Sequence, residues 1–310
     1  MLSDMISRRK FIQAGVLCGL ALPASSAFAS ELVTEDIELT YNNVKSNKIH
    51  PSFNNYKICF MSDLHCGPFM SESLLQKSIE LASNEKPDLL ILGGDYIGLP
   101  ESNPGRLFAS VRGIERQSSR NTEQVEQIYR RLGNALKTIQ VKDGIFAVMG
   151  NHDHWNNGEL CVKILSEYGV KFLINDSVRL SKDNRDLVIY GTDDYLTSVP
   201  KVSRDFIQNN KNNFKILVSH NPDFIAETVK FYGHMFDLAL AGHTHGGQII
   251  FKGIGAIAGY GVKSGKYESG LVKEKHSIIY TTRGIGVVGI PCRINCRPEI
   301  SIFKLESTYL

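Results

Sequence analysis

Short polar motifs, each directly after an apolar run of strand length, determine the architecture that this chain can adopt. Residues just past the carboxyl ends of sheet strands converge on one crevice in α/β folds. Glycines beside the polar residues let the backbone turn sharply and approach closely. We therefore expect one end of a sheet to gather these motifs into a site. The five motifs are Asp63-Leu64-His65, Gly93-Gly94-Asp95, Gly150-Asn151-His152-Asp153, Ser219-His220-Asn221 and Gly242-His243-Thr244-His245.

Apolar runs and apolar residues at helical spacing indicate where the chain forms strands and helices. The spacing predicts helices over 74–82, 125–139 and 160–168. Because helices alternate with strands in the first half and strands dominate the second, we expect the α/β class. The expected architecture is two stacked, partly mixed sheets with helices outside. The apolar runs predict buried strands at 57–61 and 88–92, and further strands at 145–149, 187–190, 216–218, 238–241, 249–251, 278–280 and 300–303.

The length and composition are those of a soluble globular protein. With 310 residues the chain can form one large domain or two small ones, and we assign residues 56–306 to one domain. Hydrophobic residues make up 42%, and no apolar run reaches the roughly 18 to 20 residues of a membrane-spanning helix. The net charge of +3 is too small and too evenly spread to indicate a nucleic-acid partner. The polar residues 30–55 are interpreted as a linker or an edge strand.

The first 29 residues have the three parts of a removable export signal. Ser7-Arg8-Arg9-Lys10-Phe11 has the form of a twin-arginine signal, and a short apolar stretch and Ala27-Phe28-Ala29 follow it. We therefore expect the twin-arginine translocation machinery to carry the folded chain to the periplasm or the outer face of the inner membrane. An ordinary amphipathic N-terminal helix and an uncleaved membrane tether are the alternatives.

The cysteines do not indicate a structural metal site. Six are present, and no two of them have the C-x-x-C spacing of structural zinc sites. Cys292 and Cys296 are near in sequence and could pair in an oxidising compartment, although their spacing does not establish the bond. Cys59 lies in a predicted buried strand and is interpreted as a small core residue.

The side chains of the five motifs are suited to a site for two divalent metal ions. Carboxylates, imidazoles and an amide oxygen suit Mn, Fe, Zn or Ni, and no thiolate is required. Alternate residues of an extended segment point the same way, so Asp63 and His65 can reach one centre. The same holds for His243 and His245, and Asp95 can bridge two metals. A single histidine at a strand end is usually structural, but five of the nine histidines lie in these motifs.

In these motifs the sequence resembles the calcineurin-like metallophosphoesterase superfamily. The family pattern is D-x-H, G-D, G-N-H-[DE], H and G-H-x-H, and all five blocks occur in this order across residues 63–245. The resemblance implies a two-layer mixed β-sandwich flanked by helices, with two divalent metals at the sheet edges. It also implies that His152 stays off the metals and faces the substrate. The implied ligands are Asp63, His65, Asp95 and His245 for one metal, and Asp95, Asn151, His220 and His243 for the other.

Over most of residues 57–305 the chain is similar to the bacterial YaeI/YkuE-like phosphodiesterases. The twin-arginine start contributes to this wider likeness, as do the segments 242–248, 281–286 and 295–299. Protein Ser/Thr phosphatases of the superfamily extend the second block to G-D-x-x-D-R-G. Here Gly98-Leu99-Pro100 stand at the last three of those positions. The missing aspartate and arginine argue against a protein phosphatase.

The resemblance implies a mechanism as well as a site. A water or hydroxide bridging the metals is the expected nucleophile at phosphorus, because two cations lower its pKa. The metals and His152 would neutralise charge on the phosphoryl oxygens, and His152 can protonate the departing alkoxide. Arg283 is a candidate for binding the phosphate or the rest of a diester, with a surface salt bridge as the alternative. Arg293 and Arg297 rank below Arg283 for this role.

The function expected from these residues is metal-dependent hydrolysis of a small-molecule or lipid-linked phosphodiester. A UDP-2,3-diacylglucosamine pyrophosphatase-like enzyme of lipid A synthesis is the alternative, although export past the inner membrane fits it poorly. A non-catalytic scaffold would show lost ligands, and none of the family's ligand positions is lost. The apolar residues 254–257 could make a peripheral contact with membrane lipid, or form a surface hairpin instead.

Overall fold

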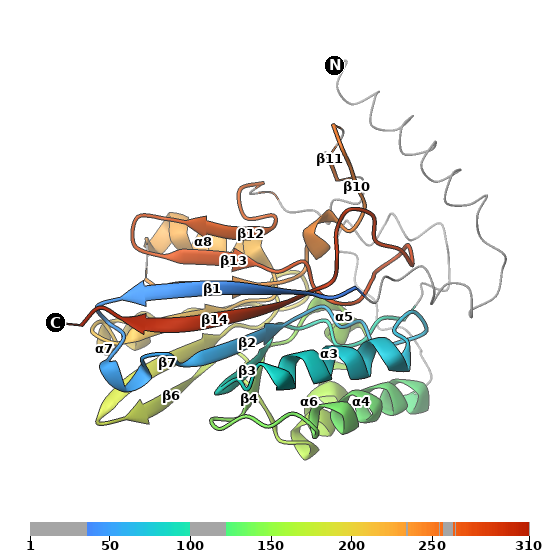
Figure 1. Cartoon of the computed structure of the whole chain (residues 1–310), viewed down its shortest axis with the longest axis horizontal. Coiled ribbons are helices and arrows are strands. Elements are labelled where there is room, and N and C mark those ends of the chain that lie inside the picture. The colour runs from blue at the N-terminus through green and yellow to red at the C-terminus, as the bar shows by residue number, and fades with distance from the viewer. Residues whose placement is uncertain are drawn as a thin grey trace.

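Two six-stranded mixed sheets stack face to face, and helices lie outside them (Figure 1). The structure is a computed structural model that describes residues 36–99, 122–233, 235–253, 255–256, 263 and 265–309. The predicted α/β class with two stacked mixed sheets is confirmed. The export signal predicted over 1–29 lies outside the described residues, as do residues 100–121. No helix among the described residues has the length and apolar character that crossing a bilayer requires.

The first sheet carries the first three polar motifs at its strand ends. β1 is parallel to β14, β14 is antiparallel to β2, and the remaining strands run parallel to β2. Residues 38–46 therefore adopt the edge-strand alternative that the sequence left open. The strands in spatial order are β1 (Glu38–Ser46), β14 (Glu299–Ser307), β2 (Lys57–Met61), β3 (Leu89–Leu92), β4 (Ile145–Ala147) and β5 (Val170–Phe172). The helices on this sheet are α3 (Glu72–Asn84), α4 (Thr122–Leu136) and α6 (Gly158–Glu167).

The second sheet carries the last two motifs. Four of its strands, β13, β9, β8 and β7, are parallel, and the two edge strands pair antiparallel. The strands in spatial order are β12 (Gly270–Lys273), β13 (Ile278–Thr281), β9 (Leu238–Ala241), β8 (Phe214–Val218), β7 (Arg185–Gly191) and β6 (Asp176–Lys182). The helices that accompany it are α7 (Arg204–Asn209) and α8 (Pro222–Tyr232).

Alternating side chains along each central strand divide the core into layers. In β2, Ile58 and Phe60 belong to the apolar core between the sheets, where they join Ile216 of β8. Cys59 and Met61 face the other way and pack with α3, α4 and α6. Every residue of β3, β4, β8 and β9 is buried. Strands covered on both faces need apolar residues on both, which explains the continuous apolar runs.

A two-stranded antiparallel unit projects from the molecule beside the second sheet's last motif (Figure 1). Its strands are β10 (Ile250–Phe251) and β11 (Gly255–Ala256), and both residues of β11 are exposed. Of the segment 254–257, for which the sequence leaves a lipid contact and a surface hairpin open, the described residues form β11. Residues 254 and 257 lie outside the described ranges, and the membrane contact stays a prediction.

The predicted strands and helices all occur, with ends that shift by a few residues. The elements without a sequence prediction include β5, β6 and β12, which are partly exposed and so lack a continuous apolar run. Cys59 is buried in the core as predicted. Cys296 is a buried free thiol, so the bond to Cys292 that the sequence left open is not formed.

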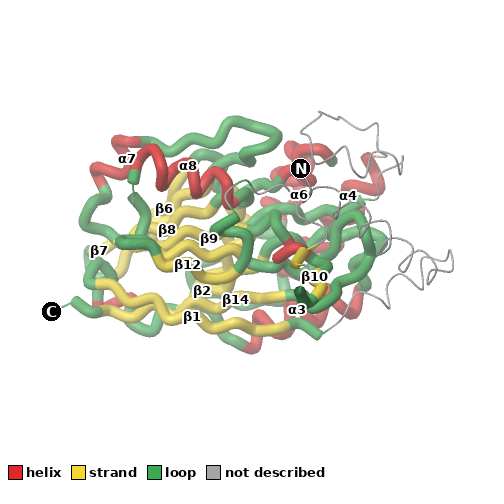
Figure 2. The backbone as a smooth tube through the Cα atoms, turned by 90° about the horizontal axis from the view of Figure 1, so that it is seen from above, coloured by secondary structure: helices red, strands yellow, loops and turns green. Residues whose placement is uncertain are grey.

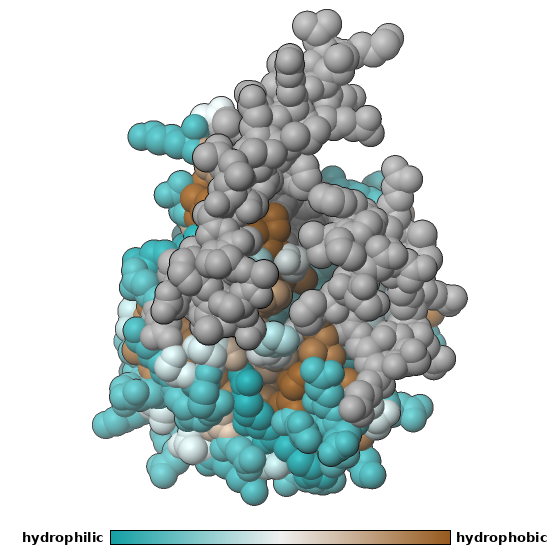
Figure 3. All heavy atoms as spheres, turned by 90° about the vertical axis from the view of Figure 1, so that its right-hand side faces the viewer, coloured by the Kyte–Doolittle hydropathy of each residue, from teal (hydrophilic) through white to brown (hydrophobic). Residues whose placement is uncertain are grey.

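The strands of both sheets lead to one end of the molecule. Seen from above, the strands occupy one part of the molecule, and α3, α4 and α6 lie toward the other end (Figure 2). Figure 3 views the molecule from the latter end, where apolar patches and hydrophilic residues lie side by side on the described surface that remains visible. The polar motifs that follow the parallel strands gather at this end.

Candidate metal centre

Each polar motif begins where a central strand ends, and the turn that follows is sharp. Asp63 and His65 follow β2, and Asp95 follows β3. His243 and His245 follow β9. All five have positive φ, between 44° and 71°. Residues other than glycine rarely adopt this backbone conformation, and those that do so cluster at functional sites.

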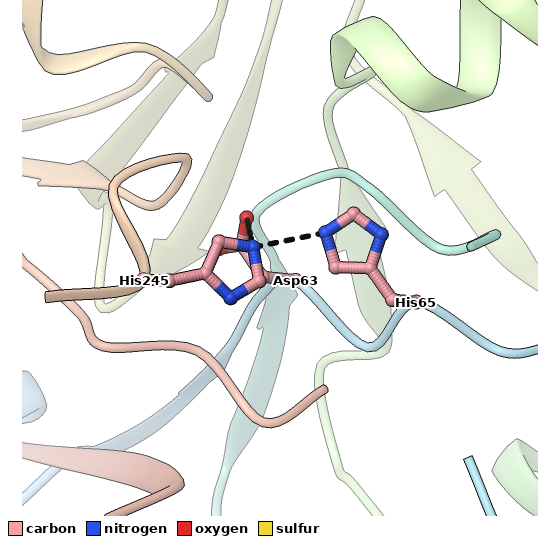
Figure 4. Close-up of side chains that lie close together, drawn as sticks. All are labelled: Asp63, His65 and His245. Atoms are coloured by element: carbon pink, nitrogen blue, oxygen red, sulfur yellow. Dashed lines mark hydrogen bonds and ion pairs between the residues drawn. The ribbon is translucent and has the colours of Figure 1, made fainter. Parts of the chain in front are cut away.

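The first group of candidate ligands consists of Asp63, His65 and His245 (Figure 4). The Nε2 atoms of the two histidines lie 3.0 Å apart, and their rings stack with centroids separated by 4.8 Å. Asp63 Oδ1 lies 3.5 Å from Nε2 of His245. One ligand atom from each residue lies within 4.8 Å of the other two, which is a spacing that one cation can bridge.

The second group consists of Asp95, His220 and His243. Nε2 of His220 lies 3.3 Å from Oδ2 of Asp95, and the rings of the two histidines meet edge-on at 5.2 Å. The same Asp95 oxygen lies 3.5 Å from Nε2 of His65, which belongs to the first group. Asp95 is therefore placed between the two groups, and its role as a bridging carboxylate stays a prediction.

The buried side-chain oxygen of Asn151 makes no hydrogen bond, and Nε2 of His220 faces the carboxylates of Asp95 and Asp63 at 3.3 and 4.0 Å. Nδ1 of His220 lies 2.8 Å from the carbonyl of Gly93, and Nδ1 of His65 lies 3.3 Å from that of Ile97. A ring that donates through Nδ1 directs the lone pair of Nε2 to the centre. Buried polar atoms are rarely left without a partner, so this donor set fits divalent cations.

Glycines allow the strand ends to approach one another. A Cβ on Gly150 would lie 2.2 Å from Oδ1 of Asp95, and one on Gly242 would lie 2.3 Å from Oδ2 of Asp63. Neither position can take a side chain without displacing a candidate ligand. This is the close backbone approach that the glycines in the motifs predicted.

Asp153 holds the turn that presents Asp95. Its buried carboxylate accepts hydrogen bonds from the backbone N–H groups of Asp95, Tyr96 and Gly150, at 2.9, 2.8 and 2.9 Å. Burial raises the pKa of Asp153 to about 7, with a further contribution from Asp95. The structure thus places Asp153 in a supporting position behind Asp95.

Burial dominates the electrostatics of the candidate ligands. It lowers the pKa of His243 to about 3 and that of His245 well below its usual value. Neutral imidazole is the form that binds metal. Burial also raises the pKa of Asp63. The pKa of His220 is raised, although burial by itself would lower it. The carboxylates of Asp95 and Asp63 outweigh the effect of burial.

His152 lies beside the candidate ligands but is only half-buried. Its ring meets the rings of His65 and Trp155 edge-on, each at 4.8 Å. One of its nitrogens also lies within 4.8 Å of ligand atoms of His65 and Asp95. The predicted separation of His152 from the metals thus stays a prediction. Its position allows contact with a substrate bound at the centre.

Arg283 forms ion pairs in the structure. Its Nε lies 2.6 Å from Glu299 Oε2 and its Nη2 lies 2.8 Å from Glu38 Oε2. Glu299 is buried, whereas the side chain of Arg283 is 23% exposed. Arg283 thus forms salt bridges, the alternative to phosphate binding that the sequence left open, and these salt bridges are partly buried. The substrate-binding role of Arg283 stays a prediction.

A sixth polar motif lies at the same end of the second sheet and was missed in the sequence. Thr192, Asp193 and Asp194 directly follow β7, as the other motifs follow their strands. Asp193 Oδ1 lies 2.8 Å from Nε2 of His154, on the short helix α5 (Asn151–Trp155). The signal was present, because Gly191 and these polar residues follow the apolar run 187–190.

Comparisons with known proteins give the family and the relatives. Residues 56–247 match the calcineurin-like phosphoesterase family. The phosphodiesterase YaeI of Escherichia coli K12 is 31% identical over 307 residues, covering 97% of this chain and 100% of the relative. YkuE of Bacillus subtilis 168, an uncharacterized metallophosphoesterase, is 29% identical, covering 98% and 99%. The crystal structure of TT1561 of Thermus thermophilus covers 73% of this chain and 88% of its own at 11% identity, with a TM-score of 0.41.

Proposed function

The chain belongs to the calcineurin-like phosphoesterase family, and from that premise we propose that it is a metal-dependent phosphodiesterase. The position of Asp95 between two groups of carboxylate and imidazole side chains carries this proposal. The Escherichia coli relative is named a phosphodiesterase, which supports diester hydrolysis here. The proposed substrates are small-molecule or lipid-linked phosphodiesters.

The proposed cofactor is a pair of divalent metal ions, with Mn, Fe, Zn and Ni as the candidates. When bound, such ions supply Lewis acidity and neutralise charge at the phosphoryl group. Asp95 would be shared between them, which its two short distances to His220 and His65 support. The remaining proposed ligands are Asp63, His65 and His245 for one ion, and Asn151, His220 and His243 for the other.

His152 is proposed as the group that donates a proton to the leaving oxygen. Its imidazole contacts the rings of His65 and Trp155 at the border between the buried ligands and solvent. Histidine titrates near neutral pH and can therefore hold and release a proton there. The backbone N–H of His152 donates to Oδ1 of Asp95 at 2.8 Å, which anchors the residue to the proposed bridging carboxylate.

Hydrolysis of a defined substrate panel by the Mn-loaded chain tests the proposed function. The panel contains bis-p-nitrophenyl phosphate, p-nitrophenyl phosphate, alkyl diesters and a UDP-linked pyrophosphate. We expect the diesters to be cleaved fastest and the activity to disappear when a chelator removes the metal. Fastest cleavage of the pyrophosphate would favour the lipid A alternative. A folded chain that binds no metal and cleaves none of these substrates would indicate that the protein is a non-catalytic scaffold.

We also propose export through the twin-arginine machinery to the periplasm or the outer face of the inner membrane. The support is the sequence of residues 7–29, which lies outside the described residues. The exposed β11 next to the site supports a peripheral contact with lipid, which would suit a lipid-linked substrate.

A further inference from the structure

Arg293 is a buried arginine directly behind the candidate ligands. In the sequence it stands between β13 and β14, outside the residues 56–247 that match the family, and only 6% of its surface is exposed. Its guanidinium donates to backbone carbonyls: Nε and Nη2 reach the oxygen of Gly286 at 3.0 and 2.6 Å, and Nη2 reaches that of Arg283 at 2.8 Å. A guanidinium engaged in this way is not placed to bind a phosphate, so its lower rank as a phosphate-binding residue has a structural reason.

The loop that Arg293 holds lies directly against Asp63. The N–H of Gly286 donates to the carbonyl of Asp63 at 2.7 Å. A Cβ on Gly284 would lie 2.6 Å from the Cβ of Asp63, so the loop and the ligand are in van der Waals contact. Asp63 has a φ of 54°, and a conformation of this kind persists only when its surroundings hold it.

The same guanidinium also reaches His245. Its Nη2 lies 3.2 Å from Nδ1 of the His245 ring, and its Nη1 lies 3.4 Å from the His245 carbonyl. The thiol of Cys296 donates to that carbonyl at 3.1 Å. His245 also has positive φ, 51°, and therefore needs the same kind of support.

We propose that Arg293 is a positioning residue that sets the spacing between Asp63 and His245, and so completes the metal site of the first group. The inference rests on the proposed function, because it assumes that this group binds a metal. Arginine suits the task, since its rigid planar fork carries five donors, whereas lysine has three donors on a flexible stem. Residues that orient metal ligands are typically worth about 10- to 100-fold in metal affinity.

The charge and the geometry of Arg293 predict opposite effects on the affinity for metal. A cation beside a metal site repels the metal ion, and removing it should strengthen binding if charge were its main influence. Arg293→Lys keeps the charge and changes the donor geometry, whereas Arg293→Gln removes the charge and most of the donors. Arg297→Lys is the matched control, because Arg297 is exposed in the same segment and pairs with Asp36 at 2.7 Å.

Calorimetric titration of the full, chelator-treated chain with Mn²⁺ measures the effect, and elemental analysis counts the bound ions. We expect two ions per wild-type chain. Both Arg293 variants should bind one of the ions roughly 10- to 100-fold more weakly and leave the other unchanged. The control should match wild type. Circular dichroism of each metal-free variant shows whether it is folded, and Arg293→Lys alone decides the matter if Arg293→Gln unfolds.

A double-mutant cycle identifies which ion is affected. Arg293→Lys should have no further effect in a His245→Ala background, where the first group is already broken, but should still weaken binding in a His243→Ala background. Equal effects in both backgrounds, unchanged affinity, or tighter binding by Arg293→Gln would each overturn the inference while leaving the proposed function intact. A wild-type chain that binds no Mn²⁺ overturns the proposed function and this inference together.

Discussion

The side-chain oxygen of Asn151 lies buried and makes no hydrogen bond in the protein. A buried polar atom without a partner costs about 1–3 kcal/mol of stability. Asn151 is proposed as a ligand of the second metal ion, and a cation would supply the partner that its oxygen lacks. The cost of leaving this oxygen unpaired is thus a reason to expect metal binding that is independent of the family.

Asn151→Ala and His220→Ala should each lose one metal ion. We expect kcat/KM on bis-p-nitrophenyl phosphate to fall at least roughly 100-fold, since even groups that only orient ligands are worth 10- to 100-fold. Metal-free Asn151→Ala should be about as stable to heat as metal-free wild type, because an unpaired buried atom has been removed. Metal-free His220→Ala should be less stable, because it loses the pair with Asp95 and leaves a cavity. Elemental analysis and thermal denaturation provide the measurements. His50→Ala is the control, because the side chain of His50 accepts a hydrogen bond from the backbone N–H of Ser52 and belongs to none of the candidate ligand groups. Two retained ions would contradict the assignment.

His152→Ala separates proton transfer from metal binding. We expect both metal ions to stay bound, and turnover to fall on the order of 100- to 1,000-fold for alkyl diesters. Bis-p-nitrophenyl phosphate should be affected less, because its leaving group needs no proton. Steady-state kinetics across a series of leaving groups gives this dependence. If the variant lost a metal ion, His152 would be a ligand, as its closeness to His65 and Asp95 permits.

Among the elements, β1 and β14 are joined to the loop after β13 by a buried carboxylate. Glu299 at the start of β14 accepts hydrogen bonds from Thr40 of β1 at 2.9 Å, from Ser301 at 2.7 Å and from the hydroxyl of Tyr280. Arg283 pairs with the same carboxylate at 2.6 Å. The edge strand and the loop that supports Asp63 are thus held by one charged cluster.

Glu299→Gln should change how stability depends on pH. Burial acts to raise the pKa of Glu299, but Arg283 and the hydroxyl donors outweigh it, so the folded-state pKa is lowered. The ionised carboxylate therefore stabilises the protein above the unfolded-state pKa of about 4.3, and this contribution is lost as the pH falls through the lower folded-state pKa. We expect the variant to lose on the order of 3 kcal/mol at pH 7.

The measurement for this prediction is urea unfolding of metal-free protein between pH 3 and pH 7. The difference between wild type and Glu299→Gln should shrink toward acid. Glu306→Gln at the other end of β14 is the control, because Glu306 pairs with exposed Lys45 at the surface. A difference that stays constant over the whole range would mean that the charge of Glu299 does not stabilise the fold.

Buried and exposed strands differ in how well the sequence predicts them. The strands β3, β4, β8 and β9 are covered on both faces, so their continuous apolar runs identify them directly. The edge strand β6 alternates between intermediate and exposed residues, and its partner β7 decides its conformation. Helix α5 is five residues long and begins at a motif residue, which is too short for an apolar period to mark.

At the scale of the whole molecule, the proposed export places a folded, metal-binding protein outside the cytoplasm. Replacing Arg8 and Arg9 with lysine should retain the chain in the cytoplasm, because the pair defines the twin-arginine signal. Immunoblots of cytoplasmic and periplasmic fractions give the distribution. Lys10→Arg, which keeps the charge and the pair, should be exported like wild type. Equal export of the double variant would rule out this route.

The amino-acid sequence alone determined the class of fold, the order of the central strands along the chain and the residues at their ends. These features are local, since a strand buried on both faces must be apolar and the residue after it must turn. The tertiary structure decided which side chains meet. Arg283 and its partner Glu38 are 245 residues apart, and Arg293 lies 48 residues from His245. No local pattern records such pairs, because they exist only once the sheets have stacked and the strand ends have converged.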